Sequence, residues 1–186
     1  ALLALLLRFV DIVQPAATTS AERTPAMECQ CLVLCDPRQP SATARAVSAA
    51  RTIQGLRSLA LLAPEGLFDP SSAPCDVQTA ALPCFATPEA ASALLGAVLA
   101  GSSRYTHVLA PMTPFGRAVL PRAAAAACSP CITDVVGFAA PLRVQRHAAA
   151  GRTLETIEVT GVSPRSPVFA AIKTVLLGLP APSKAK

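Results

Sequence analysis

Short apolar runs alternate along the chain with segments in which apolar residues recur at helical spacing. Runs of this length are typical of strands buried on both faces, as in a parallel sheet. The pattern predicts five strands, at 29–35, 58–63, 77–86, 106–110 and 132–139. It predicts helices between them, at 41–56, 88–101 and 115–127. Such alternation predicts an α/β fold with a doubly wound, mostly parallel sheet.

Local residues mark where two of these helices begin. Ser41 can cap the first helix, and Thr87-Pro88 places a cap and a proline at the start of the second. The helix at 88–101 is apolar nearly all round, and we expect it to be buried.

After residue 139 the alternation stops and three strands follow without helices, at 142–147, 154–160 and 168–172. Residues 154–160 alternate in polarity with the period of a strand that has two unlike faces. We expect these extra C-terminal strands to form an antiparallel edge or a small appended sheet.

The composition favours a protein with a partner and argues against binding to nucleic acids. Hydrophobic residues make up 52% of the 186 residues, the mean hydropathy is +0.48 and charged residues are 15%. With so little charge to cover the surface, we expect some apolar area to face another chain. The net charge of +5 comes from scattered basic residues, without the basic patch that nucleic-acid binding needs. A mildly basic balance also suits the mitochondrial matrix.

The two ends of the sequence differ from its middle, and we divide the chain into an N-terminal arm and linker (1–27), a domain (28–176) and a tail (177–186). Residues 1–13 are apolar but contain Arg8 and Asp11. At about 1.5 Å per residue, a helix of this length falls well short of a bilayer core of roughly 30 Å. The segment suits a signal-peptide core, the end of a transit peptide or an amphipathic docking helix. We expect the arm and the tail to pack against other chains.

Seven cysteines, an odd number, argue against a closed disulfide framework. Cys29, Cys31 and Cys35 share one apolar run and suit small buried hydrophobes. Cys128 and Cys131 have CxxC spacing, which fits packing beside a helix-to-strand turn, half of a zinc site or a redox dithiol. We favour packing, because a second CxxC is lacking.

Residues 105–136 carry the most specific pattern, a Tyr-Thr-His strand, a Phe-Gly-Arg helix containing Pro-Arg, and an Ile-Thr-Asp-Val strand. In order and spacing they resemble the N-terminal domain of the electron transfer flavoprotein alpha subunit. The matching positions are Tyr105, Thr106, His107, Val108, Phe115, Gly116, Arg117, Leu120, Pro121, Arg122, Ala124, Ile132, Thr133, Asp134 and Val135.

The resemblance implies a Rossmann-like fold of the adenine-nucleotide alpha-hydrolase type that packs against a beta subunit as a scaffold. In that family a separate C-terminal domain holds the FAD with glycine-rich, Arg-containing and Gln-Thr-Gly motifs. Neither a Gly-x-Gly-x-x-Gly nor a Gln-Thr-Gly motif occurs in this sequence. We therefore expect only the N-terminal domain here, with the C-terminal FAD-binding domain absent and FAD present only if a separate domain supplies it.

A nucleotide on such a fold would lie beyond the carboxyl ends of the first and fourth strands, at residues 35–37 and 110–114. Phosphate cradles need closely spaced backbone N–H groups, and Pro111 and Pro114 each remove one. We interpret this site as closed or vestigial.

The remaining candidate residues suit structural roles. His107 and His147 lie on strands, and Asp134 suits capping or an interdomain hydrogen bond. Arg117 and Arg122 are five residues apart on one helix and point in different directions, so we expect Arg122 to bind a partner carboxylate or to stabilise the sheet edge. The spacing reveals no Ser/His/Asp or Cys/His constellation. The sequence therefore predicts no catalytic, cofactor-binding or metal residues, and no enzyme.

Together these features suggest a non-catalytic, electron transfer flavoprotein alpha-like accessory subunit of a mitochondrial respiratory-chain complex. It would sit in the matrix or on the matrix side of the inner membrane, beside a beta-like chain, with the N-terminal arm able to contact a membrane complex. One alternative is a working electron transfer flavoprotein whose FAD domain is on another chain. The other is a regulatory module that binds adenine nucleotides.

Overall fold

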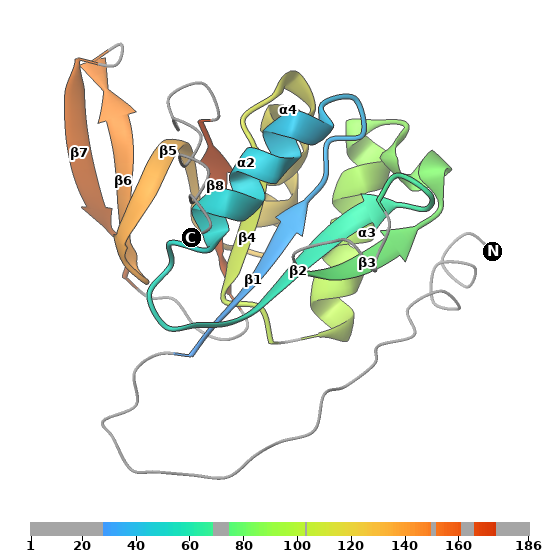
Figure 1. Cartoon of the computed structure of the whole chain (residues 1–186), viewed down its shortest axis with the longest axis horizontal. Coiled ribbons are helices and arrows are strands. Elements are labelled where there is room, and N and C mark those ends of the chain that lie inside the picture. The colour runs from blue at the N-terminus through green and yellow to red at the C-terminus, as the bar shows by residue number, and fades with distance from the viewer. Residues whose placement is uncertain (1–27, 69–74, 103, 150–151, 161–165, 174–186) are drawn as a thin grey trace, which may run out of the picture.

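The computed structural model describes residues 28–68, 75–102, 104–149, 152–160 and 166–173. Within them, one eight-stranded sheet carries helices on both faces (Figure 1). The predictions for the arm at 1–27 and for the tail at 177–186 concern residues outside these ranges.

The strands are β1 (Cys29–Leu34), β2 (Leu56–Pro64), β3 (Asp76–Ala80), β4 (His107–Pro111), β5 (Cys131–Ala140), β6 (Arg143–Ala148), β7 (Thr153–Glu158) and β8 (Val168–Ile172). The helices are α2 (Pro40–Ala50), α3 (Pro88–Gly101), α4 (Pro114–Ala126) and a short 3₁₀ helix, η1 (Leu82–Phe85). None of the helices in the described part of the chain is long and apolar enough to cross a membrane.

The sheet has the strand order β3-β2-β1-β4-β8-β5-β6-β7. All pairs from β3 to β5 are parallel, and β6 and β7 continue the sheet as antiparallel strands. The α/β, mostly parallel, Rossmann-like fold is thus confirmed. The antiparallel edge expected from the late strands is present in β6 and β7.

The placement of β8 corrects the prediction, because this strand does not join the edge. It lies between β4 and β5, parallel to both. All five of its residues are buried. An apolar strand of this kind is stable only where both of its faces are covered.

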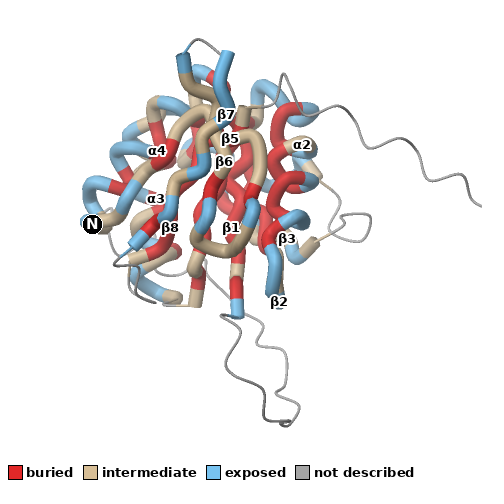
Figure 2. The backbone as a smooth tube through the Cα atoms, turned by 90° about the vertical axis from the view of Figure 1, so that its left-hand side faces the viewer, coloured by how far each residue is buried: buried red, intermediate tan, exposed pale blue. Residues whose placement is uncertain are grey.

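Two hydrophobic cores fill the space between the sheet and its helices, and Figure 2 shows buried residues in the sheet and on the helix faces that meet it. The core on the α2 face contains buried residues of α2, the inward side chains of β1 and β8, and Val144 of β6. The core on the other face contains Leu32, Val108 and Phe169 of the sheet, with α3 and α4 packed over them.

Three local predictions are wrong. The strand predicted at 77–86 ends at Ala80 and gives way to η1, where Pro83 lacks the N–H group that a strand ladder needs. The helix predicted at 41–56 ends at Ala50, before a turn that includes Gly55 at φ 76°. The helix at 88–101 is buried on one face only, through Ala91, Leu94, Leu95 and Val98.

Strand β5 changes direction part-way along its length. Its first half runs parallel to β8 as far as Val135, which is level with Ile172 at the carboxyl end of β8. Its second half runs back toward the amino ends of the parallel strands. Pro141, just beyond β5, contacts His107, the first residue of β4. Figure 1 shows β5 curving in this way into β6.

Candidate functional site

The crevice outside the carboxyl ends of β1 and β4 is the candidate site, because the strand order reverses between these two neighbours. The chain leaves β1 toward α2, which covers one face of the sheet, and leaves β4 toward α4, which covers the other (Figure 1). Three of the four buried polar or charged residues in the described chain border this crevice: Asp36, Thr43 and Thr113.

On the β1 side, a turn closed by Asp36 leads into α2. The backbone N–H of Asp36 donates to Thr43 Oγ1 at 3.0 Å, and the Asp36 carboxylate accepts from the backbone N–H of Arg38 at 2.9 Å. The N–H of Gln39 donates to the Asp36 carbonyl at 3.1 Å. The buried carboxylate thus organises its own turn.

On the β4 side, Thr113 caps α4. Its hydroxyl oxygen accepts from the N–H of Gly116 at 3.1 Å, and its carbonyl accepts from the N–H of Arg117 at 2.9 Å. Gly116 is buried, and a Cβ at this position would overlap the carbonyl oxygen of Pro111. Residue 116 is therefore glycine because α4 approaches the end of β4 closely.

These bonds leave the crevice unsuited to a phosphate. Four N–H groups at the start of α2 and α4 donate to Gln39 and Thr113, and two in the turn before α2 donate to Asp36. Pro40 and Pro114, at the first helical positions, have no N–H to offer. A pyrophosphate of FAD or a nucleotide needs several converging donors, so the described residues here do not fit such a group.

A cavity of about 420 Å³ lies beside the start of α4. It is lined by Met112, Pro114, Arg117 and Ala118. Arg117 is exposed and is the charged side chain of this set. The cavity offers one cation among apolar groups, which is a sparse set of contacts for a cofactor.

His107 is fully buried, and both ring nitrogens have hydrogen-bond partners. Nε2 lies 2.7 Å from the carbonyl oxygen of Pro141, and Nδ1 lies 2.8 Å from Thr106 Oγ1. Burial lowers the pKa of His107, and the bond to Pro141 opposes this shift in part. The residue therefore connects β4 to the turn between β5 and β6.

His147 and Asp134 lie apart from the crevice residues of β1. His147 is half-buried on β6, and its Nδ1 is buried without a hydrogen-bond partner. Asp134 has a φ of 61°, and its carboxylate lies 3.8 Å from Lys173 Nζ. Asp134 thus sits at the bend of β5, a position that the sequence pattern did not reveal.

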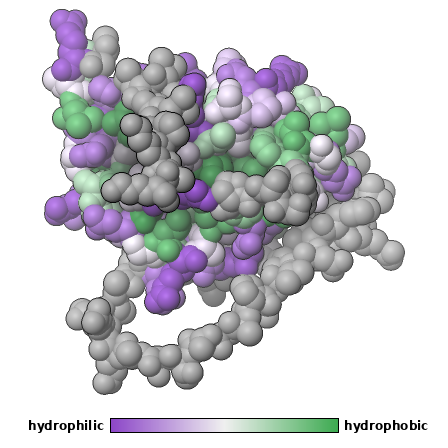
Figure 3. Space-filling model, viewed as in Figure 1, coloured by the Kyte–Doolittle hydropathy of each residue, from purple (hydrophilic) through white to green (hydrophobic). Residues whose placement is uncertain are grey.

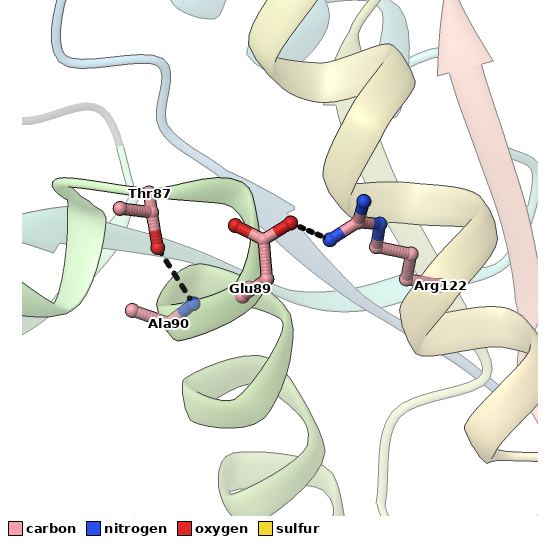
Figure 4. A network of polar contacts seen from close by, with 4 residues as sticks. All are labelled: Thr87, Glu89, Ala90 and Arg122. Carbon is pink, nitrogen blue, oxygen red and sulfur yellow. Dashed lines mark hydrogen bonds and ion pairs between the residues drawn. The ribbon is translucent and has the colours of Figure 1, made fainter.

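The two arginines of α4 have different surroundings. Arg122 forms an ion pair with Glu89 of α3, as Figure 4 shows, so its carboxylate partner lies within the chain. This partner was not predicted, and the expected binding of Arg122 to a carboxylate of another chain, or its stabilisation of the sheet edge, stays a prediction. The Glu89 carboxylate accepts hydrogen bonds from its own backbone N–H and from Arg122. Both bonds lower the pKa of Glu89, and the bond to the backbone has the larger effect.

The cysteines divide by burial. Cys29, Cys31 and Cys35 are fully buried, and burial raises the pKa of the Cys35 thiol to about 12. Cys131 is half-buried at the start of β5 with a pKa raised to about 11 by burial, whereas Cys128 is exposed and has a φ of 49°. The described residues contain no group of three or more His, Cys, Asp or Glu arranged to hold a metal ion.

Comparison with known proteins finds a family model, described as the electron transfer flavoprotein domain, that matches residues 76–185. The chain belongs to the electron transfer flavoprotein family. Two relatives carry the name mitochondrial electron transfer flavoprotein subunit alpha, from Oryza sativa subsp. indica and subsp. japonica. Each is 42% identical over 60 residues, which cover 32% of this chain and 17% of the relative.

The match confirms the resemblance that residues 105–136 carry, and identifies an electron transfer flavoprotein alpha-like N-terminal domain. Within that domain, sequence reasoning placed the crevice correctly at the ends of β1 and β4. The sequence did not reveal the hydrogen bonds of Thr43 and Thr113 there, or the close approach at Gly116. The Thr-Pro pair at 113–114 is the same capping signal as Thr87-Pro88, and would have identified Thr113.

Proposed function

We propose that this alpha-like chain is a non-catalytic structural subunit of a mitochondrial respiratory-chain electron-transfer complex. In this assembly it packs against an electron transfer flavoprotein beta-like chain on the matrix side of the inner membrane. The mitochondrial alpha subunits among its relatives support the compartment and the class of partner.

The crevice carries the proposal. On a Rossmann-like fold a nucleotide would bind in this crevice, and here backbone donors beside β1 and β4 are engaged by Asp36, Gln39 and Thr113. Gly116 allows α4 to approach the carbonyl oxygen of Pro111 closely. The domain contributes packing surface, and any FAD would be supplied by a separate domain.

The surface is consistent with a chain that packs against others. Leu82 and Leu154 are 61% and 57% exposed. Leu82 follows the edge strand β3, and Leu154 lies in β7 at the other edge of the sheet. Glu89 is the charged residue of α3, and the other outward positions of this helix are alanine, serine and glycine. Figure 3 shows hydrophobic residues over the segment that joins β3 to α3, with hydrophilic residues along much of the rim.

The test is to isolate the endogenous chain from mitochondria in mild detergent, separate it by native electrophoresis and identify its companions by mass spectrometry. The proposal expects migration with a large complex that includes a beta-like chain. Migration as a free monomer would overturn it.

The same preparation distinguishes the second candidate, a working electron transfer flavoprotein, which the family match itself favours. Flavin absorbance in stoichiometric amount with this chain and a beta-like chain would support that function in place of a structural one. Calorimetry with AMP and ATP tests the nucleotide-binding regulator. If a nucleotide bound in the crevice, Arg117→Ala would weaken binding, whereas Arg57→Ala, at the opposite edge of the sheet, would not.

A further inference from the structure

The second half of β5 forms, with β6 and β7, an arm comprising residues 136–149 and 152–159. Beside the hydrophobic contacts of Phe138, Val144 and Val159, two further sets of contacts join this arm to the rest of the domain. One is the bend at Asp134, where the chain leaves β8, and the other surrounds His107, where the arm meets the amino end of β4.

The bend combines an unusual backbone conformation with a break in the strand register. Asp134 adopts a φ of 61°, which costs a non-glycine residue roughly 1–2 kcal/mol. The β5–β8 register shifts between Ile132 and Val135, as expected at a bulge. Lys173 holds this bend twice, through its N–H to the Val135 carbonyl at 2.7 Å and through Nζ at 3.8 Å from the Asp134 carboxylate.

The contact at the far end is a hydrogen-bonded clasp. Nε2 of His107 lies 2.7 Å from the Pro141 carbonyl, and the rings of His107 and Phe138 meet edge to face with centroids 5.9 Å apart. A second, exposed bond runs from Gln54 Nε2 to the Ala139 carbonyl at 3.3 Å. The His107 bond is thus the buried polar link between the arm and the central sheet among the described residues.

The hydrogen bonds of the His107 ring fit a neutral ring, which its full burial favours. A carbonyl only accepts, so Nε2 carries a proton and donates to Pro141. The backbone N–H of Gln30 donates to Thr106 Oγ1 at 3.0 Å, so the Thr106 hydroxyl is free to donate to Nδ1 of a neutral ring at 2.8 Å. Both ring nitrogens are then satisfied, and Thr106 also bonds to the side chain of Cys29. A second proton on the ring would turn the Thr106 hydroxyl toward the Gln30 carbonyl, at 3.1 Å, and leave a charge in a fully buried position.

The elements around the ring supply no carboxylate to balance that charge. The strand β1 presents Cys29 and Cys31, whose thiol pKa values are raised by burial. The buried faces of α2 and β8 carry no titratable residue. The charged side chains of the arm are paired across β6 and β7, as Arg143–Glu158 and Arg146–Glu155.

Charged residues elsewhere near this edge are also accounted for. Glu28 and Arg57 pair with each other at 2.8 Å on the surface, and Arg104 lies over the ring of Tyr105. Asp134 and Lys173 lie at the other end of β8, because Val168 is level with His107 and Ile172 with Val135. His147 is the other titratable histidine, and it lies on the arm itself.

We propose that the arm opens as a unit about Asp134, and that protonation of His107 promotes this opening. Movement of Pro141 and Phe138 away from the ring would expose the charged imidazole to water with the least rearrangement, since β1, β8 and α2 enclose the other sides of the ring. The hydrophobic contacts of Phe138, Val144 and Val159 keep the arm closed when the ring is neutral.

The direction of the pH effect follows from the lowered pKa of buried His107. The neutral ring contributes its full stabilisation of the closed arm above the ordinary histidine pKa of about 6.5. This contribution is lost as the pH falls from there through the lower pKa of the closed state. In that window, linkage to one proton raises the opening constant up to about tenfold per pH unit.

Hydrogen exchange on the full chain, corrected for intrinsic rates and measured between neutral and mildly acidic pH, tests the proposal. Amides of the second half of β5, of β6 and of β7 should share one opening constant, larger than that of β1 and β4, and it should rise as the pH falls. His107→Gln should remove the rise, while His147→Gln, the matched control, should keep it.

A rise that persists in His107→Gln or disappears in His147→Gln would overturn the proposal, as would arm amides that open only together with β1. If His107→Gln does not fold, imidazole NMR of the unaltered chain replaces it. The proposal then requires the His107 titration and the rise in arm exchange to share one midpoint, and different midpoints would refute it.

Discussion

Replacing Gly116 with alanine tests whether α4 is pressed against the end of β4. The added Cβ would overlap the carbonyl oxygen of Pro111 and would lie 3.4 Å from the Cβ of Ala110. A backbone atom cannot rotate away, so α4 must shift, which also strains the hydrogen bond from Gly116 N–H to Thr113. Overpacking costs about 1–3 kcal/mol and loss of a cap about 1 kcal/mol, while the gain in helix propensity returns at most about 1 kcal/mol. The expected net destabilisation is about 1–3 kcal/mol.

Gly96→Ala is the matched control. Gly96 lies in the interior of α3, and a Cβ there would meet nothing within 4 Å. Helix propensity alone predicts a stabilisation of up to about 1 kcal/mol. Thermal unfolding followed by far-ultraviolet circular dichroism suits a chain without tryptophan, and each kcal/mol should move Tm by about 2–4 °C. A Gly116→Ala variant as stable as the unaltered chain, or less affected than Gly96→Ala, would refute the close approach.

Three further predictions concern caps, thiols and the bend of β5. Thr113→Ala should destabilise the domain by about 1–2 kcal/mol, and by more than Thr87→Ala, because Thr113 is 4% exposed whereas the Thr87 cap of Figure 4 is at the surface. Urea unfolding of both variants measures the two losses of stability, and equal losses would contradict the prediction. Timed alkylation at mildly alkaline pH, read by peptide mass spectrometry, should label exposed Cys128 first, then Cys131 with its pKa of about 11, and buried Cys31 last. Early labelling of Cys31 would show that the hydrophobic core on the α2 face is open to solvent. Asp134→Asn should keep the bend, because Asn tolerates positive φ, whereas Asp134→Val should destabilise the domain by about 1–3 kcal/mol. Equal stability of the two variants would exclude backbone strain at this position.

The sequence was sufficient for some of the features that depend on local pattern. The helix at Pro88–Gly101 was predicted closely, because Thr87-Pro88 marks its start. The β-α alternation likewise gave the parallel sheet and, through it, the position of the crevice. These signals lie within a few residues of the structure that they specify.

The features that were missed depend on contacts distant in sequence. The apolar run of Val168–Ile172 indicates a strand buried on both faces, but its place between β4 and β5 is set by pairing with residues distant in sequence. The bend of β5 depends on Lys173, and the partner of Arg122 is Glu89, 33 residues earlier. Gly116 was recognised as part of a motif, but its reason, the carbonyl of Pro111, requires the packing of α4.

Native mass spectrometry of the assembly isolated from mitochondria tests the structural role most directly. After gentle release of this chain in the gas phase, the account predicts the mass of the polypeptide alone, from a complex that also contains a beta-like chain. A released chain that retains the added mass of a flavin or an adenine nucleotide would contradict it.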